Sequence, residues 1–449
     1  MFDHLGPIEH GAVELGDLTV FCGKNNTGKT YVSYLIYGFY HYLSKNISLR
    51  GSENFELYQK MDQNNCDISL DALKEYLPKF HEKICKSVLD NVPQIFNVKK
   101  SFFEQFSFEV EAGRNLKEIT YDTLKNVIKD VISNVDGAVI KEISRKKLRL
   151  NLPMKKQSND DAVEAVTILI ILFTLCGILY EDPDCSIYML PAERSGLNIF
   201  YKELNVNRNN VLFELSENIN GGKKINSISK YPLPISEYIN LLNSMEIEEE
   251  EQSVYSEFAA MLEKKIVHGA FTVLDNGKID FTIEGEKKID FHLSSSTAKS
   301  LFGLDYLLKN KLDYGSYLII DEPEQNLHPD NQRYIARLIA QMVNSGIKVI
   351  ISTHSDYIIK ELNNLILLGN KFNGYEKLMA EYGYEETELL SYDKVKGFVF
   401  HKSAVEPVPV NEKGLQMDIF DEVINSMNES SDDIYYSYCE VAETDEEEW

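Results

Sequence analysis

Cysteine is scarce in this sequence: only six of its 449 residues are cysteines, and they are scattered along the chain. No two of them form a C-x-x-C pair, and none has a histidine partner at zinc-finger spacing. This pattern argues against a disulfide framework and a structural zinc site. It is typical of reduced thiols in a cytosolic protein.

Segments that would insert into a membrane are also missing. The one candidate, Ala165 to Tyr180, is shorter than the about 20 residues that a membrane-spanning helix needs. It ends in the acidic residues EDPD without a basic flank, so we expect a buried helix there instead. The N-terminus lacks the basic start and apolar core of a signal peptide, and we therefore expect a cytoplasmic protein that does not bind membranes.

Positive charge is in deficit, with 46 Lys and Arg against 71 Asp and Glu and a formal net charge of −25. Such a charge repels nucleic acid unless the basic residues gather on one face. One basic cluster is present, and it consists of Lys141, Arg145, Lys146, Lys147, Arg149, Lys155 and Lys156. It is either a solvated face or a contact for nucleic acid or an acidic partner, and the sequence leaves both readings open.

The strongest positive feature is a glycine-rich loop near the N-terminus. It fills the pattern G-x-x-x-x-G-K-[ST]; the apolar run DLTVF before it predicts a strand, and the residues after it predict a helix. Glycines allow successive backbone N–H groups to turn inward around a triphosphate. The residues expected to bind the nucleotide are Gly23, Asn25, Asn26, Thr27, Gly28, Lys29 and Thr30.

Two side chains of this loop have separate expected roles. Lys29 reaches the β- and γ-phosphates as a point charge, and the Thr30 hydroxyl lies where Mg²⁺ needs an oxygen ligand. The loop therefore predicts ATP and Mg²⁺ as cofactors.

Carboxylates and a histidine follow two further predicted strands. Asp321 and Glu322 come directly after the apolar run Tyr317 to Ile320, at the strand end where open α/β sheets bind ligands. We expect Asp321 to hold Mg²⁺ opposite Thr30 and Glu322 to polarise the attacking water as the catalytic base. His354 follows the β-rich run KVIIST and is expected to donate a hydrogen bond to the γ-phosphate or to that water.

In this order the motifs resemble those of the ABC-type ATPases of the RecF, SMC and OLD branch. Gly23 to Thr30 is similar to Walker A, LIIDEPEQNLHP to Walker B with its D-loop, and STHSDYII to the segment of the switch histidine. Within the branch, GPIEHGAVELGDLTVF and LPAERSG are most similar to standalone ATPases of bacterial anti-phage systems of the PARIS type. The resemblance implies an α/β fold: an ABC-type P-loop ATPase head whose mixed β-sheet is flanked by helices.

The same resemblance divides the chain. We expect the ATPase core in residues 1–40 and 161–428, a mainly helical insertion in residues 41–160, and an acidic C-terminal tail in residues 429–449. The insertion is too short, and too poor in heptads, for the long paired arms of SMC proteins. After His354 the chain has no D-x-D pair of the kind that holds metal in TOPRIM nucleases, so we expect no nuclease activity of its own.

The resemblance also implies a head-to-tail homodimer, in which ATP lies between the loop of one subunit and a signature motif of the other. LSSST, Leu293 to Thr297, stands at that motif, with Ser294 and Ser296 as expected nucleotide contacts and a helix beginning near Thr297. Serines replace the usual glycines, so we expect slow or partner-dependent hydrolysis. Glu193 stands where such ATPases often carry a metal-contacting glutamine.

The sequence is compatible with two functions. In the first, the chain is an ATP-driven sensor and scaffold, a dimer or higher homo-oligomer, that holds a separate TOPRIM- or HNH-type nuclease effector and releases it on detecting a phage trigger protein. In the second, it is a RecF-like DNA-repair ATPase that binds duplex DNA as an ATP-dependent dimer. The net charge of −25 favours the first, because the second needs the basic cluster to face the DNA.

The last 21 residues, from Glu429, carry nine acids and no lysine or arginine. Their mutual repulsion predicts an extended end. Tyr435, Tyr436, Tyr438 and Trp449 nevertheless offer apolar contacts. The tail is therefore either a disordered solubility segment or a docking segment for a partner.

Overall fold

Among the residues that the structure describes, six strands form the central sheet, in the order β15-β14-β3-β13-β12-β8. Five of them run parallel, and β15 lies antiparallel to β14 at one edge. Every residue of β3 and of β12 is buried, as expected for parallel strands covered on both faces. The strands are β3 (Leu18–Gly23), β8 (Ile187–Leu190), β12 (Tyr317–Asp321), β13 (Lys348–Thr353), β14 (Val395–Phe400) and β15 (Val405–Val408). The mixed sheet flanked by helices confirms the predicted α/β class.

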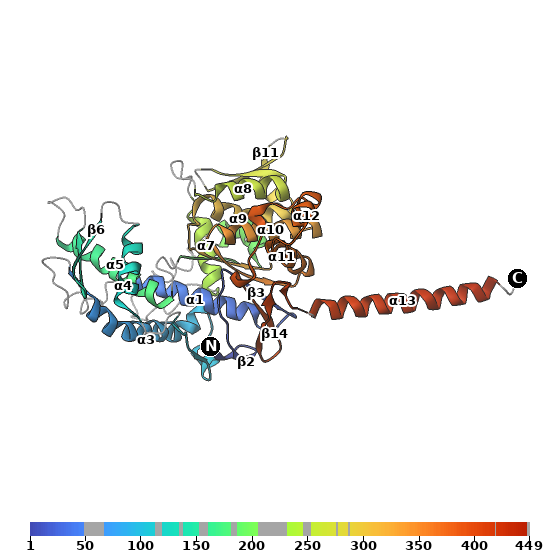
Figure 1. Cartoon of the computed structure of the whole chain (residues 1–449). Coiled ribbons are helices and arrows are strands. Elements are labelled where there is room, and N and C mark those ends of the chain that lie inside the picture. Colours follow the sequence, from blue (N-terminus) through green and yellow to red (C-terminus); the bar gives the residue numbers. More distant parts are fainter. Residues whose placement is uncertain are drawn as a thin grey trace, which may run out of the picture.

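This computed structural model describes residues 1–48, 67–112, 119–133, 138–151, 160–180, 186–204, 231–245, 253–274, 277–285, 288–417 and 419–446. Helices precede or follow the central strands (Figure 1). The glycine-rich loop opens α1, and the Ser355 hydroxyl caps α11 by accepting from the Ile358 N–H. The helices around the sheet are α1 (Lys29–Ser48), α7 (Leu233–Asn243), α8 (Ser256–Leu262), α9 (Ser296–Asn310), α10 (Pro329–Asn344), α11 (Asp356–Gly369) and α12 (Tyr375–Tyr382).

Three helices and a small antiparallel sheet lie to one side of the central sheet, at the left of Figure 1. The helices are α3 (Leu70–Ile95), α4 (Tyr121–Ser133) and α5 (Asp160–Tyr180), and the sheet has the order β4 (Asp67–Ser69), β7 (Lys147–Asn151), β6 (Val139–Ser144). The apolar run expected to be a buried helix lies in α5, and its side chains from Ile170 to Leu172 are buried. Across the described ranges, no helix is long and apolar enough to cross a membrane.

The basic cluster falls largely on the β6–β7 hairpin, where most side chains of β6 are exposed. One of its members, Lys146, is paired with an acid and lies 3.2 Å from Asp71. Glu142, the acid within this segment, pairs with Lys125 of α4 at 2.7 Å. Lys155 and Lys156 lie outside the described residues.

Short strands and turns complete the fold. An antiparallel hairpin is formed by β9 (Gly269–Val273) and β10 (Ile279–Ile283), and β10 also pairs with β11 (Lys288–Asp290). The remaining strands are β1 (Phe2–Leu5), β2 (Ile8–Gly11), β5 (Ser107–Phe108), β16 (Val410–Asn411) and β17 (Gly414–Leu415). Short helical segments are η1 (Lys100–Phe103), η3 (Glu263–Val267), η4 (Phe291–Leu293), η5 (Glu386–Glu388) and η6 (Tyr392–Lys394).

The C-terminal segment forms one long helix, α13 (Ile419–Glu446), which projects away from the body of the molecule (Figure 1). The expected extended end is therefore wrong as far as Glu446. Glycine and proline are both absent after Gly414, so nothing interrupts the helix, and repulsion between like charges one turn apart costs only about 0.5 kcal/mol per pair. Exposed apolar side chains on α13 are Met427, Ile434, Tyr435, Tyr436 and Tyr438.

Candidate functional site

The predicted site residues gather at one edge of the central sheet. Strands β3, β13, β12 and β8 are parallel neighbours, so their carboxyl ends meet there. The glycine-rich loop follows β3, Asp321 ends β12 with Glu322 directly after it, His354 follows β13, and Glu193 lies shortly after β8. Residues from four distant parts of the sequence thus share one surface.

Two glycines shape the loop after β3. Gly23 has φ +144° and Gly28 has φ +101°, both in the region that side chains rarely adopt. A Cβ on Gly23 would lie 2.5 Å from the carbonyl oxygen of Phe400, and one on Gly28 would lie 2.7 Å from the Ile8 side chain. The Thr27 hydroxyl braces the turn by donating to the Lys24 carbonyl at 2.8 Å. The loop therefore fits a phosphate cradle that only glycine can complete at these two positions.

Lys29 lies across the loop. Its Nζ donates to the carbonyl oxygens of Gly23 and Lys24, each at 3.0 Å, and its side chain is only 7% exposed. Burial lowers the pKa of this ammonium, and the nearby Asp321 carboxylate partly offsets that effect. A positive charge is thus held at the place where phosphates would replace the loop carbonyls as partners.

Thr30 and Asp321 meet across the site. The Thr30 hydroxyl donates to Asp321 Oδ2 at 3.2 Å, and the Ser352 hydroxyl donates to Oδ1 of the same carboxylate. Asp321 is 4% exposed, and burial raises its pKa, opposed by the hydrogen bond from Ser352. A hydroxyl beside a carboxylate is the start of a magnesium ligand set that phosphate oxygens and water complete.

Glu322 has a left-handed backbone, with φ +52°. Its N–H donates to the Ser352 carbonyl at 2.9 Å, and its side chain is half-buried. A non-glycine residue in this conformation costs about 1 kcal/mol or more, and such strain is concentrated at functional sites. Its carboxylate acts electrostatically on both Lys29 and His354, so these groups belong to one site.

Glu324 is a site residue that sequence reasoning missed. Its carboxylate accepts from the His354 backbone N–H at 2.6 Å and from the Thr353 hydroxyl at 2.9 Å, which ties the segment after β12 to the end of β13. Burial, and then the charge of Lys29, lowers the pKa of His354, which favours the neutral ring. The repeated acid in DEPE was the available signal for Glu324.

The predicted signature segment differs in detail from expectation. Helix α9 begins at Ser296, one residue before the expected start, and the Ser295 hydroxyl caps it by accepting from the Ala298 N–H at 3.1 Å. The Ser294 hydroxyl is buried and donates to the Phe291 carbonyl at 2.6 Å. Ser296 is exposed. In this conformation the Ser294 hydroxyl, which we expected to contact the nucleotide, points into the protein. The exposed serines of the segment are Ser295 and Ser296.

Glu193 is exposed beside the site, and its charge contributes to the raised pKa of Asp321. Its neighbour Arg194 is buried, and sequence reasoning missed it. Arg194 donates to the backbone carbonyls of Asp321 and Glu322, and no local motif encodes such contacts.

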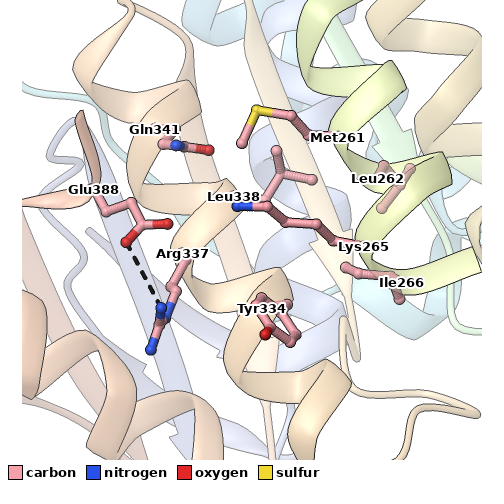
Figure 2. A pocket seen from close by; sticks show the side chains of 9 residues that line it. All are labelled: Met261, Leu262, Lys265, Ile266, Tyr334, Arg337, Leu338, Gln341 and Glu388. Atoms are coloured by element: carbon pink, nitrogen blue, oxygen red, sulfur yellow. Dashed lines mark ion pairs between the residues drawn. The ribbon is translucent and has the colours of Figure 1, made fainter. Parts of the chain in front are cut away.

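A small pocket lies away from this site. The pocket in Figure 2 lies between α10 and the segment from α8 to η3, with Arg337 and Glu388 in its wall, and its volume of about 10 Å³ admits at most one water. Within the part of the chain that the structure describes, no group of three His, Cys, Asp or Glu side chains has the geometry of a metal site.

Comparison with known proteins places this site in a family. The family model described as AAA ATPase domain matches residues 6–359, which include the loop, Asp321, Glu322 and His354. No curated protein matches the sequence. A solved structure of the Smc head domain with an extended coiled coil, bound to the C-terminal domain of ScpA and derived from Pyrococcus furiosus, is 12% identical; the alignment covers 96% of this chain and 98% of that chain, with a TM-score of 0.32. Because the family model spans most of the sequence and all three motifs, the chain belongs to the AAA ATPase domain family.

Proposed function

We propose that this chain binds ATP with Mg²⁺ and hydrolyses the bond between its β- and γ-phosphates. The observation that carries the proposal is the meeting of Thr30 with Asp321, since it brings a phosphate loop and a strand-end acid into one site. The bound Mg²⁺ would supply positive charge that stabilises the transferring phosphoryl group.

The chain's own residues divide the remaining work. Lys29 contributes a charge toward the phosphates from a buried position. Glu322, which is half-buried, orients a water and takes its proton. His354, whose neutral form is favoured, donates one hydrogen bond to the phosphate or to the water.

Nucleotide binding tests the proposal directly. We expect Lys29→Ala to weaken ATP affinity by about 10²-fold, because it removes a charge-assisted contact that the loop is built around. The exposed Lys24 of the same loop offers the matched control, and Lys24→Ala should change the affinity by less than about 3-fold. Equal losses in the two variants would contradict the proposal.

We further propose that the active unit is a head-to-tail homodimer, in which the start of α9 faces the nucleotide of the other subunit. The exposed Ser295 and Ser296 at the N-terminus of α9 support this arrangement, because helix N-termini attract phosphate. Measuring the mass of the purified chain with and without ATP tests it.

The biological setting that we propose is anti-phage defence. The chain would hold a separate nuclease effector, of TOPRIM or HNH type, and release it when a phage protein is detected, as the resemblance to the AriA ATPase subunit of the PARIS system implies. The exposed apolar side chains of α13 support a partner-binding role, since a helix that only kept the chain in solution would not need them. Co-purification with the products of neighbouring genes, followed by mass measurement, tests this proposal.

DNA repair of the RecF type is the second candidate, and the exposed β6–β7 hairpin with its basic residues is the observation in its favour. Binding of a short DNA duplex at physiological salt, with ATP present, separates the two functions. We expect no binding, because the net charge is −25 and Lys146 of the cluster is already paired with Asp71.

A further inference from the structure

Arg194 is a buried cation whose hydrogen-bond partners among the described residues are all backbone carbonyls. It is 1% exposed, and within the described residues it forms no ion pair with a carboxylate. Its Nε donates to the Ser300 carbonyl at 3.1 Å, Nη1 donates to Pro191 at 3.3 Å and to Asp321 at 2.5 Å, and Nη2 donates to Glu322 at 2.7 Å. One guanidinium therefore joins three segments of the fold.

Burying a charge in this way is costly unless its donors are satisfied. The planar guanidinium offers five donors in a fixed fork, so one side chain reaches carbonyls on several sides. A lysine carries its charge at a single atom and cannot span the same acceptors. The arrangement at Arg194 is thus specific to arginine.

The contacts to Asp321 and Glu322 fix a strained piece of backbone. Along a strand, successive carbonyls point in opposite directions, yet the carbonyls of these two consecutive residues accept from the same guanidinium. The left-handed conformation of Glu322 makes this possible. Its N–H is held from the other side by the Ser352 carbonyl. The direction of the Glu322 side chain is therefore set by hydrogen bonds to both of its peptide groups.

The contact to Ser300 links this backbone to the start of α9. Two further hydrogen bonds run in parallel: the Ser300 hydroxyl donates to the Gln325 carbonyl at 3.1 Å, and the Thr297 hydroxyl donates to the Asn326 carbonyl at 2.9 Å. The first turn of α9 and the segment after β12 are thus connected through one buried side chain and two hydroxyls.

We propose that Arg194 is a positioning residue that aims Glu322 and transmits the state of the α9 N-terminus to it. The inference rests on the proposed ATPase function and deepens it. Glu322 in one subunit would respond when the α9 of the same subunit engages the nucleotide of a second copy. Hydrolysis at the two sites of a dimer would then be coupled.

The test compares Arg194→Met and Arg194→Lys with the wild-type chain in ATP binding and in ATP hydrolysis. We expect hydrolysis to fall about 10²-fold, the cost of a misaimed catalytic group, while ATP affinity changes less than about 3-fold. Arg337 is the matched control, because it is another buried arginine, paired with Glu361 at 2.6 Å and placed at the pocket of Figure 2. Arg337→Lys should lower the midpoint of unfolding without a selective loss of hydrolysis.

A double-mutant cycle separates positioning from general support of the fold. In a Glu322→Gln background, Arg194→Lys should cause no further loss of hydrolysis, because the group it aims is already disabled. A further loss of 10-fold or more, or hydrolysis by Arg194→Lys at the wild-type rate, overturns the inference.

If both Arg194 variants fail to fold, the pair Thr297→Val and Ser300→Ala removes the two parallel hydroxyl links and leaves the guanidinium in place. We expect that double variant to lose about 10-fold in hydrolysis at unchanged ATP affinity, and the same cycle with Glu322→Gln applies. An unaltered rate would overturn the proposed coupling. A wild-type chain that binds no ATP would instead overturn the proposed function itself, together with this inference.

Discussion

Thr30, the second residue of α1, donates a hydrogen bond of 3.2 Å to Asp321, the last residue of β12. These residues are 291 positions apart in the sequence, and the contact closes the candidate site around the loop. Each side chain supplies oxygen, the ligand type that Mg²⁺ prefers. The effect of this pair on the Mg²⁺ requirement of hydrolysis can therefore be measured separately from ATP binding.

Thr30→Val should raise the Mg²⁺ concentration needed for half-maximal hydrolysis by about 10-fold, because the valine keeps the shape of threonine but lacks its oxygen. Titrating Mg²⁺ at saturating ATP measures this shift. Ser33→Ala is the control one turn along the same helix, since the buried Ser33 hydroxyl has no hydrogen-bond partner among the residues that the structure describes. A magnesium requirement that is unchanged in Thr30→Val would rule out this role.

Glu322→Gln should bind ATP with near-wild-type affinity and hydrolyse it about 10²-fold or more slowly. The amide keeps the size of the side chain but cannot accept the proton of the attacking water. Bound nucleotide recovered after desalting, analysed for ATP and ADP, measures the effect. Glu406→Gln, an exposed glutamate on β15, is the control and should behave as wild type. Hydrolysis at the normal rate in Glu322→Gln would show that the base lies elsewhere.

Asp305 in α9 should make stability depend on pH. It is 2% exposed, and burial raises the pKa of its carboxyl from the ordinary 3.8 to about 7. The Lys309 ammonium, 2.9 Å away, opposes this rise in pKa, and the charge of Glu263 adds to it. The folded state therefore binds more protons than the unfolded state between these values. It follows that the free energy of unfolding falls as pH rises from about 4 to about 7.

The expected size of this contribution is up to about 4 kcal/mol. Asp305→Asn removes this titration. As pH rises, the free energy of unfolding of the wild type should therefore fall relative to that of the variant. Urea unfolding at pH 5 and pH 7.5 measures it, with the exposed Glu257→Gln as control. Parallel pH profiles for wild type and Asp305→Asn would contradict the prediction.

Truncation after Asn428 should leave ATP hydrolysis intact, because the side chains of α13 that the structure describes beyond that point are exposed to solvent. Binding of a partner protein should be lost if the apolar residues of the helix, such as Ile434 and Tyr438, are its docking surface. Pull-down of the neighbouring gene products by full-length and truncated chains compares the two. Retention of both properties would leave α13 as a solubility segment.

The sequence predicted those parts of the site that arise from local pattern. The strand ending at Gly23, the loop, and the acids after Tyr317 to Ile320 are each encoded within a few neighbouring residues, so periodicity and motif spacing located them. Arg194 was missed for the opposite reason. Its acceptors are carbonyls of Ser300, Asp321 and Glu322, and a carbonyl is present at every residue whatever its type.

The acidic tail and the signature segment show a second limit. Net charge predicted an extended end, but an uninterrupted run without glycine or proline still forms the helix α13. The resemblance predicted a signature segment at LSSST, but which hydroxyl faces solvent depends on where the helix begins. Its start at Ser296 turns Ser294 inward and makes Ser295 the cap.

Strand β3 lies between β13 and β14, both of which come much later in the chain. Gly23 pairs with Phe400, so the loop leaves a strand whose two neighbours are made only after all the intervening segments have been synthesised. A nascent chain on the ribosome would therefore carry the complete phosphate-loop sequence without the walls that shape it until those two strands have been made. The ability to bind nucleotide should arise only as the region around Phe400 emerges, so shorter nascent chains should not bind ATP.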